Sequence, residues 1–152
     1  MVYRDAREPD AYLKLPKIAA NDLKILWCTE WYDGPEAGVL WYHNRRCYFA
    51  TCRLLDDDTK IVLVVALTEE QLGELEYRVT KWVEKVGGKS PHVYIDIPVE
   101  KPGDPRLFMD YHTEMEKRPK PDYSQNQVLG WFEFLRSSEL CFGMGVEKSN
   151  KS

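Results

Sequence analysis

Apolar and polar residues alternate with a period of two from residue 23 onward, and this pattern predicts a strand over residues 23–32. In a regular strand this alternation places Ile25 and Trp27 on the same face. The Asp-Gly-Pro sequence at 33–35 then breaks the pattern, because glycine tolerates positive φ and proline cannot donate to a central ladder. The first strand is therefore expected to end in a turn over residues 33–38.

Three more strand-like runs follow at short spacing. Residues 39–43 and 47–54 are expected to form the second and third strands, with a bend at Asn44-Arg45 between them. Residues 61–67 are apolar on both faces, which is typical of an interior strand that a helix covers on one side. Short connections favour antiparallel neighbours, so the first four strands are predicted to form a meander.

The next segment has the signature of an amphipathic helix over residues 69–86. Thr68 is a favourable N-cap, and Gln71 stands at the position that completes a capping box. Apolar residues at helical spacing form a stripe that is expected to pack on the sheet through Trp82. The stripe consists of Leu72, Leu75, Val79, Trp82, Val83 and Val86.

The last third of the chain is less regular. Residues 92–99 alternate well enough for a strand, and the composition of residues 127–135 favours another. The pattern over residues 107–118 does not decide between a strand and a short helix.

These elements predict a single α+β domain over residues 23–142. We expect a mostly antiparallel sheet of about five to six strands, with one main helix at about 69–86 packed on one face. Residues 1–22 are expected to form an N-terminal arm, and residues 143–152 a polar, disordered tail.

Composition and charge narrow the possible function classes. The chain has 21 Lys and Arg against 25 Asp and Glu, and this balance argues against general nucleic-acid binding, which needs clustered cations. The longest apolar run is far shorter than the ~20 residues that a membrane helix requires. Four cysteines without a Cys-x-x-Cys pair fit free thiols in a reducing compartment. We expect a cytoplasmic protein without a cofactor and without membrane association, and the oligomeric state stays open.

A weak candidate for metal-dependent chemistry surrounds His112. On a strand, Asp110, His112 and Glu114 would stand at alternate positions and face the same way. Carboxylate and imidazole groups together suit a divalent metal or a hydrolytic site. A polar, solvent-facing side of a strand explains the same residues without any chemistry, and we favour that interpretation. We therefore assign no catalytic and no metal-binding residues.

Aromatic residues concentrate in the predicted meander, close to two arginines. If residues 127–135 do not cover the sheet face opposite the helix, some of these rings are exposed. Exposed Trp and Tyr rimmed by arginine have the composition of a protein interface, or of a stacking platform for a base. The equally weighted alternative is that all the rings are core. The candidate binding residues are Trp31, Tyr32, Asp33, Trp41, Tyr42, Arg45 and Arg46.

Three functions remain, and the sequence leans against an enzyme. The preferred one is a non-catalytic binding protein (an inhibitor, an immunity-type protein or an adaptor) that engages a protein partner through the aromatic sheet face and the 33–38 turn. The second is a small-ligand binding protein, for a nucleotide or base, in which Trp and Tyr stack and Arg45 or Arg46 binds phosphate. The third is a small metal-dependent hydrolase built on Asp110, His112 and Glu114.

Overall fold

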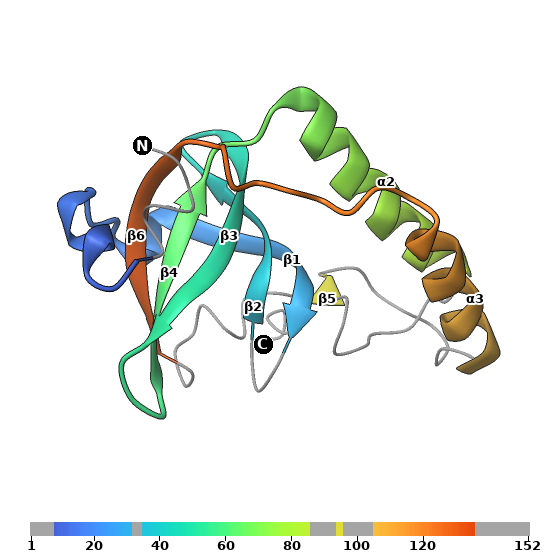
Figure 1. Cartoon of the computed structure of the whole chain (residues 1–152), viewed down its shortest axis with the longest axis horizontal. Helices are drawn as coiled ribbons and strands as arrows, with labels where there is room; N and C mark the ends of the chain where they lie inside the picture. Colours follow the sequence, from blue (N-terminus) through green and yellow to red (C-terminus); the bar gives the residue numbers. More distant parts are fainter. Residues whose placement is uncertain (1–7, 32–34, 86–93, 96–104, 136–152) are drawn as a thin grey trace, which may run out of the picture.

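The computed structural model describes residues 8–31, 35–85, 94–95 and 105–135 (Figure 1). In these residues six strands form a single antiparallel sheet in the order β5-β1-β2-β3-β4-β6. The strands are β1 (Leu23–Trp31), β2 (Pro35–Tyr42), β3 (Arg45–Leu54), β4 (Thr59–Val65), β5 (Tyr94–Ile95) and β6 (Val128–Leu135).

The sheet confirms the predicted α+β fold and its antiparallel meander, because β1 to β4 lie side by side in chain order. The strand predicted over 127–135 exists as β6, but it pairs with β4 in the plane of the sheet and does not lie over a face. The strand predicted over 92–99 is described only at β5, and its other residues lie outside the described part of the chain.

The connection between β2 and β3 is tighter than predicted. His43 and Asn44 both have positive φ, at 50° and 61°, and Tyr42 pairs with Arg45 across them. Two central residues with positive φ are the mark of the two-residue hairpin turn that matches the twist of antiparallel strands. The bend therefore lies one residue earlier than the predicted Asn44-Arg45, and Arg45 already belongs to β3.

Strand β1 departs from the predicted alternation at a β-bulge. Its register against β2 shifts between Ile25 and Trp27. Ile25 packs in the same cluster as Leu40, whereas Trp27 packs on the other face, beside the helices. The prediction that Ile25 and Trp27 share a face is wrong, because an extra residue in one strand reverses the side chains that follow it, here up to the next register shift after Cys28.

Gly38 pairs with Cys28, just beyond the bulge, and allows β1 to approach closely. A Cβ atom at this position would collide with the carbonyl oxygen of Trp27 and would lie 2.7 Å from the Cα of Cys28. Both obstacles are backbone atoms, so no side-chain rotation relieves the collision.

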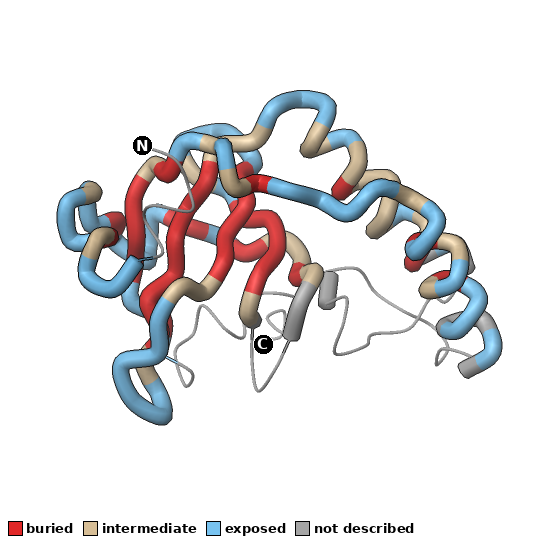
Figure 2. Tube along the Cα trace, in the orientation of Figure 1, coloured by how far each residue is buried: buried red, intermediate tan, exposed pale blue. Residues whose placement is uncertain are grey.

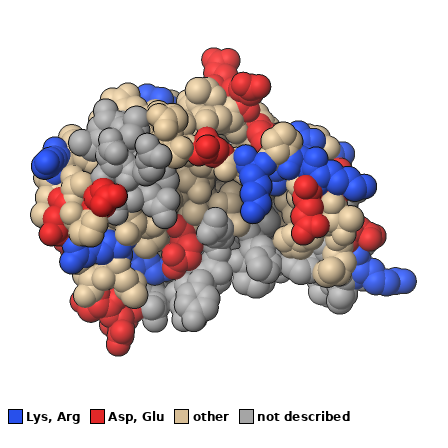
Figure 3. Space-filling view, in the orientation of Figure 1, with Lys and Arg blue, Asp and Glu red and all other residues tan. Residues whose placement is uncertain are grey.

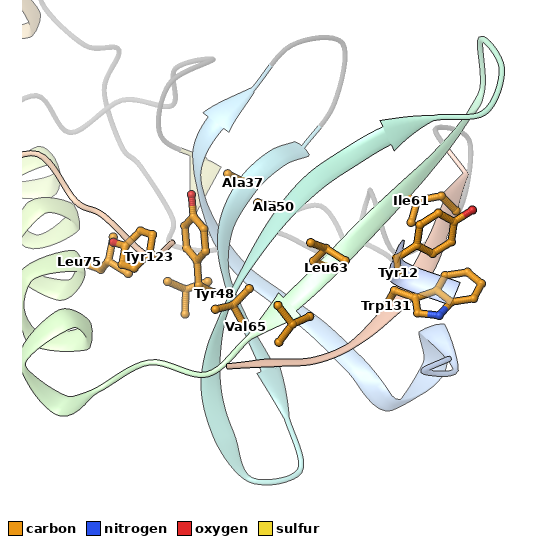
Figure 4. Packing of buried hydrophobic residues seen from close by; sticks show 12 residues of the cluster. Tyr12, Ala37, Tyr48, Ala50, Ile61, Leu63, Val65, Leu75, Tyr123 and Trp131 are labelled. Carbon is orange, nitrogen blue, oxygen red and sulfur yellow. The ribbon is translucent and has the colours of Figure 1, made fainter. Parts of the chain in front are cut away.

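Both faces of the sheet are buried (Figure 2). On the helix side, Tyr48 and Val65 pack with Leu75 and Tyr123, while Tyr12 and Trp131 meet at the far end of the same cluster (Figure 4). The rings on the opposite face belong to the core as well. Its buried members include Ile25, Cys28, Leu40, Phe49, Val62, Phe132 and Phe134.

The N-terminal segment packs along the outer edge of β6. Two short 3₁₀ helices, η1 (Ala11–Lys14) and η2 (Ala20–Asp22), precede β1. Between them the backbone N–H of Ile18 donates to the Trp131 carbonyl at 2.7 Å, and the Trp131 N–H donates to the Pro16 carbonyl at 3.0 Å. Gly130 permits this approach, because a Cβ there would lie 2.7 Å from the Pro16 oxygen.

Helix α2 (Glu69–Lys85) begins with the predicted capping box. The Gln71 backbone N–H donates to Thr68 Oγ1 at 3.1 Å, and the Thr68 N–H donates to Gln71 Oε1 at 3.0 Å. Asn126 Nδ2 donates to the same Gln71 oxygen and, at 2.7 Å, to the Ala66 carbonyl. These bonds fix the start of the helix to the end of β4 and to the segment before β6.

A second helix, α3 (Pro105–Glu116), settles the undecided segment at 107–118. It packs against α2, where the Trp82 and Tyr111 rings meet edge to face at a centroid distance of 5.1 Å. The predicted stripe of α2 is therefore shared: Leu75 packs on the sheet, whereas Trp82 is buried mainly against α3. Among the described residues, no helix is long and apolar enough to cross a membrane.

A charged pair joins β2 and β4, and its lysine is buried. Lys60 of β4 is only 4% exposed, and its ammonium group pairs with the Glu36 carboxylate of β2. A buried ammonium group needs such a partner, because an unpaired charge in an apolar interior loses its hydration without compensation.

Replacement of Trp82 by alanine should destabilise the protein by about 3–5 kcal/mol, because the ring is 1% exposed and its removal leaves a cavity between α2 and α3. Urea unfolding measures the change. Thr80→Ala, at an exposed position of the same helix, is the control. A loss below about 1 kcal/mol for Trp82→Ala would contradict the packing described here.

Two glycine replacements should change the stability in opposite directions. Gly38→Ala should destabilise the sheet, because its Cβ meets backbone atoms of β1. Gly73→Ala should stabilise the protein by about 1 kcal/mol, because alanine favours the helix and no atom lies within 4 Å of the new Cβ. Thermal unfolding of both variants tests the pair, and equal shifts in Tm would count against the close approach at Gly38.

Candidate functional site

A cleft lies between the helix-side face of the sheet and the two helices. It consists of two adjoining pockets of about 170 Å³ and 490 Å³. Both pockets are lined by Thr29, Leu75, Arg78, His112 and Met115, so they form one continuous space. Strand β1 forms one wall, and α2 and α3 form the others. The segment after α3 lines one side of the larger pocket.

The smaller pocket is mainly apolar, and we call it the apolar chamber. Trp27, Cys28, Val79 and Tyr111 line it in addition to the shared residues. Trp27 reaches it because the bulge in β1 turns this side chain towards the helices. The indole Nε1 of Trp27 is buried and has no hydrogen-bond partner among the described residues. Such an orphan donor costs free energy and is uncommon in folded proteins.

The larger pocket carries most of the charge, and we call it the basic chamber. Arg118 and Lys120 line it together with the shared Arg78, and Glu116 is the acidic residue in its lining. Tyr48 and Tyr123 form its aromatic wall, with ring centroids 4.2 Å apart. In Figure 3, Lys and Arg side chains gather on the helical part of the molecule, in the region of α2 and α3.

Glu74 organises the two arginines of the basic chamber. Arg118 binds it through two nitrogens, Nε to Oε2 at 2.7 Å and Nη2 to Oε1 at 2.5 Å. Arg78, one helical turn along α2, donates from Nε to Oε2 at 2.9 Å. Such charge-assisted pairs have a fixed geometry, and Arg118 also stacks at 4.0 Å on the Tyr77 ring. The guanidinium groups are therefore held in place before any ligand arrives.

Each arginine keeps one terminal nitrogen outside this network. Arg78 Nη2 donates to the Pro119 carbonyl at 3.2 Å, and Arg118 uses Nε and Nη2 on Glu74. In the part of the chain that the structure describes, Nη1 of neither residue makes a hydrogen bond. Each of these two arginines, which line the cleft, therefore keeps donor groups that an acceptor can use.

Tyr111 and Tyr123 of the cleft remain neutral at physiological pH. Burial raises the pKa of Tyr123 to about 12, and burial also raises the pKa of Tyr111. The Tyr111 hydroxyl donates to the backbone carbonyl of Arg78 at 3.1 Å, which ties α3 to α2 at the chamber wall. These phenols therefore serve as walls and hydrogen-bonding groups, and they add no charge.

The three residues considered as a weak candidate for metal-dependent chemistry do not converge. Asp110, His112 and Glu114 lie on helix α3, where each residue advances by about 100°, so His112 points away from the side that the two acids share. The expectation that all three face the same way fails because it assumed a strand. His112 alone lines the cleft. No group of metal-binding side chains occurs within the described residues.

The predicted aromatic and arginine residues lie away from the cleft, at the β2–β3 hairpin. Trp41 is 40% exposed and pairs across the strands with Arg46, which forms an ion pair with Glu76 of α2. Tyr42 stacks on His43 at a centroid distance of 4.1 Å, and Arg45 is exposed. Trp31 belongs to β1, but its side chain, with Tyr32 and Asp33, lies outside the described part of the chain.

The cleft residues were missed for a physical reason. Arg78 and Arg118 are 40 positions apart, and they meet only because both bind Glu74. Trp27 enters the cleft through a bulge that no pattern in β1 reveals. The one available signal was the cluster Lys117-Arg118 after an apolar segment, which by itself indicates only a solvated surface.

Glu74 should make the stability of the protein sensitive to acid. Hydrogen bonding to Arg118 lowers its pKa below the ordinary value, and its side chain is 27% exposed. Stabilisation from a lowered carboxyl pKa is complete above the unfolded-state value, about 4.3, and is lost as the pH falls through the folded-state value. The Glu74→Gln variant should therefore be less stable than wild type at pH 7, with the gap closing in acid.

Unfolding by urea at a series of pH values tests this expectation. Glu70→Gln removes another α2 carboxylate, one that makes no contact with Arg118, and is the matched control. A gap between wild type and Glu74→Gln that stays constant down to strongly acidic pH would contradict the role given to this ion pair.

Comparison with known proteins leaves the function to be argued from this geometry. No protein-family profile matches the chain, and no curated protein or solved structure matches it.

Proposed function

We propose that this protein binds a small anionic ligand in the cleft between the sheet and helices α2 and α3. The observation that carries the proposal is the meeting of two oriented arginines and Lys120 with an aromatic, partly apolar cleft. Ligand sites in proteins combine apolar walls with a few fixed polar groups in this way. This function belongs to the small-ligand class predicted from the sequence, although different residues carry it.

The size of the cleft supports a small molecule. The basic chamber of about 490 Å³ lies within the range of about 300–1,000 Å³ that is usual for ligand sites. Its arginines are held by Glu74, so a ligand does not have to order these long side chains when it binds. Preorganisation of this kind raises affinity because less conformational entropy is lost.

The lining of the basic chamber carries more positive than negative charge. Arg78, Arg118 and Lys120 line it, and Glu116 is its acidic lining residue. Glu74, which pairs with both arginines, and Glu114, which acts electrostatically on Arg118, lie outside this lining. The chain as a whole has a net charge of −4, so the basic chamber departs from the overall charge of the protein.

Protein binding through the β2–β3 hairpin is the second candidate. One observation favours it: Trp41, a large aromatic residue, is 40% exposed beside exposed Arg45 and Arg46. Tryptophan and arginine are enriched at protein interfaces, where their burial provides much of the affinity. This surface is separate from the cleft, so the two candidate functions are compatible.

Lys120→Gln should weaken the binding of ribose 5-phosphate and phenyl phosphate by about three- to tenfold, because an exposed cation contributes about 1 kcal/mol to such a contact. Isothermal titration calorimetry at low salt measures the dissociation constants. The matched control is Lys117→Gln, which removes the same charge from an exposed residue outside the cleft lining. Absence of binding by both anions, or equal effects of the two variants, would refute the proposal.

A further inference from the structure

We infer that the ligand of the cleft is a pyrimidine nucleotide, with its single ring in the apolar chamber and its phosphate in the basic chamber. This inference rests on the proposed function and specifies its ligand class. Three observations carry it: the volume of the apolar chamber, the unpartnered indole of Trp27, and the position of Arg118 and Lys120, which line the basic chamber but not the apolar one.

The volume of the apolar chamber selects one ring. An apolar cavity of about 150 Å³ holds one benzene molecule, and the chamber measures about 170 Å³. A pyrimidine is a single six-membered ring, whereas a purine adds a fused five-membered ring. Trp27, Val79 and Tyr111 form walls of this chamber, so the second ring of a purine would have to extend into the adjoining basic chamber, where we place the phosphate.

The Trp27 indole distinguishes a base from a hydrocarbon ring. Its Nε1 donor is buried and has no hydrogen-bond partner among the described residues, and an unsatisfied buried donor costs free energy. Pyrimidines carry a ring carbonyl, which is a strong acceptor. Because the nitrogen is shielded from solvent, the hydrogen bond that we infer requires the indole to turn towards the bound ring. The new hydrogen bond then removes an existing penalty, and a phenyl ring offers no such gain.

The basic chamber fits the phosphate end of the same molecule. Arg78 and Arg118 each present an Nη1 group that makes no hydrogen bond within the described residues, and Lys120 adds a third cation. Guanidinium groups bind phosphate oxygens in a fixed geometry. Arg78 lines both chambers, so a ligand with its ring in one and its anion in the other passes this residue.

A panel of ligands on the wild-type protein tests the inference. Calorimetry compares the 5′-monophosphates of uridine, cytidine, adenosine and guanosine with ribose 5-phosphate and phenyl phosphate. We expect the pyrimidine nucleotides to bind at least about tenfold more tightly than the purine nucleotides and ribose 5-phosphate. Equal affinity for purine nucleotides, or for ribose 5-phosphate, would overturn the inference while leaving anion binding in the cleft intact. Absence of binding by every member would overturn the proposed function itself.

Two variants locate the ring. Trp27→Phe keeps an aromatic wall but removes the N–H, so uridine monophosphate should bind several-fold more weakly while phenyl phosphate is unaffected. Val79→Phe fills the apolar chamber, so pyrimidine nucleotides should lose their advantage over ribose 5-phosphate, which should bind as before. This placement would be refuted if Trp27→Phe weakened the binding of uridine monophosphate and phenyl phosphate equally. It would also be refuted if Val79→Phe weakened the binding of pyrimidine nucleotides and ribose 5-phosphate equally. Should Val79→Phe fail to fold, the wild-type panel and Trp27→Phe still decide the question.

Discussion

The close approach of β1 to β2 at Gly38 is the constraint on which the candidate site depends. Only a residue without a Cβ leaves room for the Trp27 carbonyl and the Cys28 backbone at this position. The bulge next to it turns Trp27 and Thr29 towards the helices, while Cys28 stays in the opposite core. Without the extra residue, the side chains after Ile25 would exchange faces, and the cleft would lose its tryptophan.

The apolar stripe of helix α2 packs on the sheet in its first half and against α3 in its second half. Near its start, Leu75 packs with Tyr48 and Tyr123 on the sheet, and the capping box and Asn126 fix the direction in which the helix leaves. Further along, Trp82 packs mainly against α3, and Trp27 of the sheet contacts the same cluster. The helix pair thereby forms the far wall of the cleft, and Glu74 of α2 holds the arginines at its mouth.

Local chemistry explains why some of this was predictable from the sequence. The capping box joins Thr68 to Gln71, only three residues later, so it can be recognised in the sequence. The continuous apolar run in β4 likewise indicates a strand that is buried on both faces. The orientation of Trp27 was not predictable, because a bulge depends on how two strands pair. The cleft was missed for a similar reason: Glu74 and Arg118 are 44 positions apart and meet only after α3 has packed. The segment 107–118 was undecided because its apolar residues fit either period, and its contact with Trp82 selects the helix.

The division of the core into clusters has a consequence for the motions of this molecule. The cluster around Trp82 and Tyr111 is joined to the sheet through a few side chains, of which Trp27 belongs to both. Structural units with few shared contacts can open separately from the rest of a fold. We expect amide hydrogens of α3 and of the second half of α2 to exchange faster than those of β3 and β4. A molecule bound between the sheet and the helices would contact both units and hold them together. It would therefore slow amide hydrogen exchange in α2 and α3 even at residues that it does not touch.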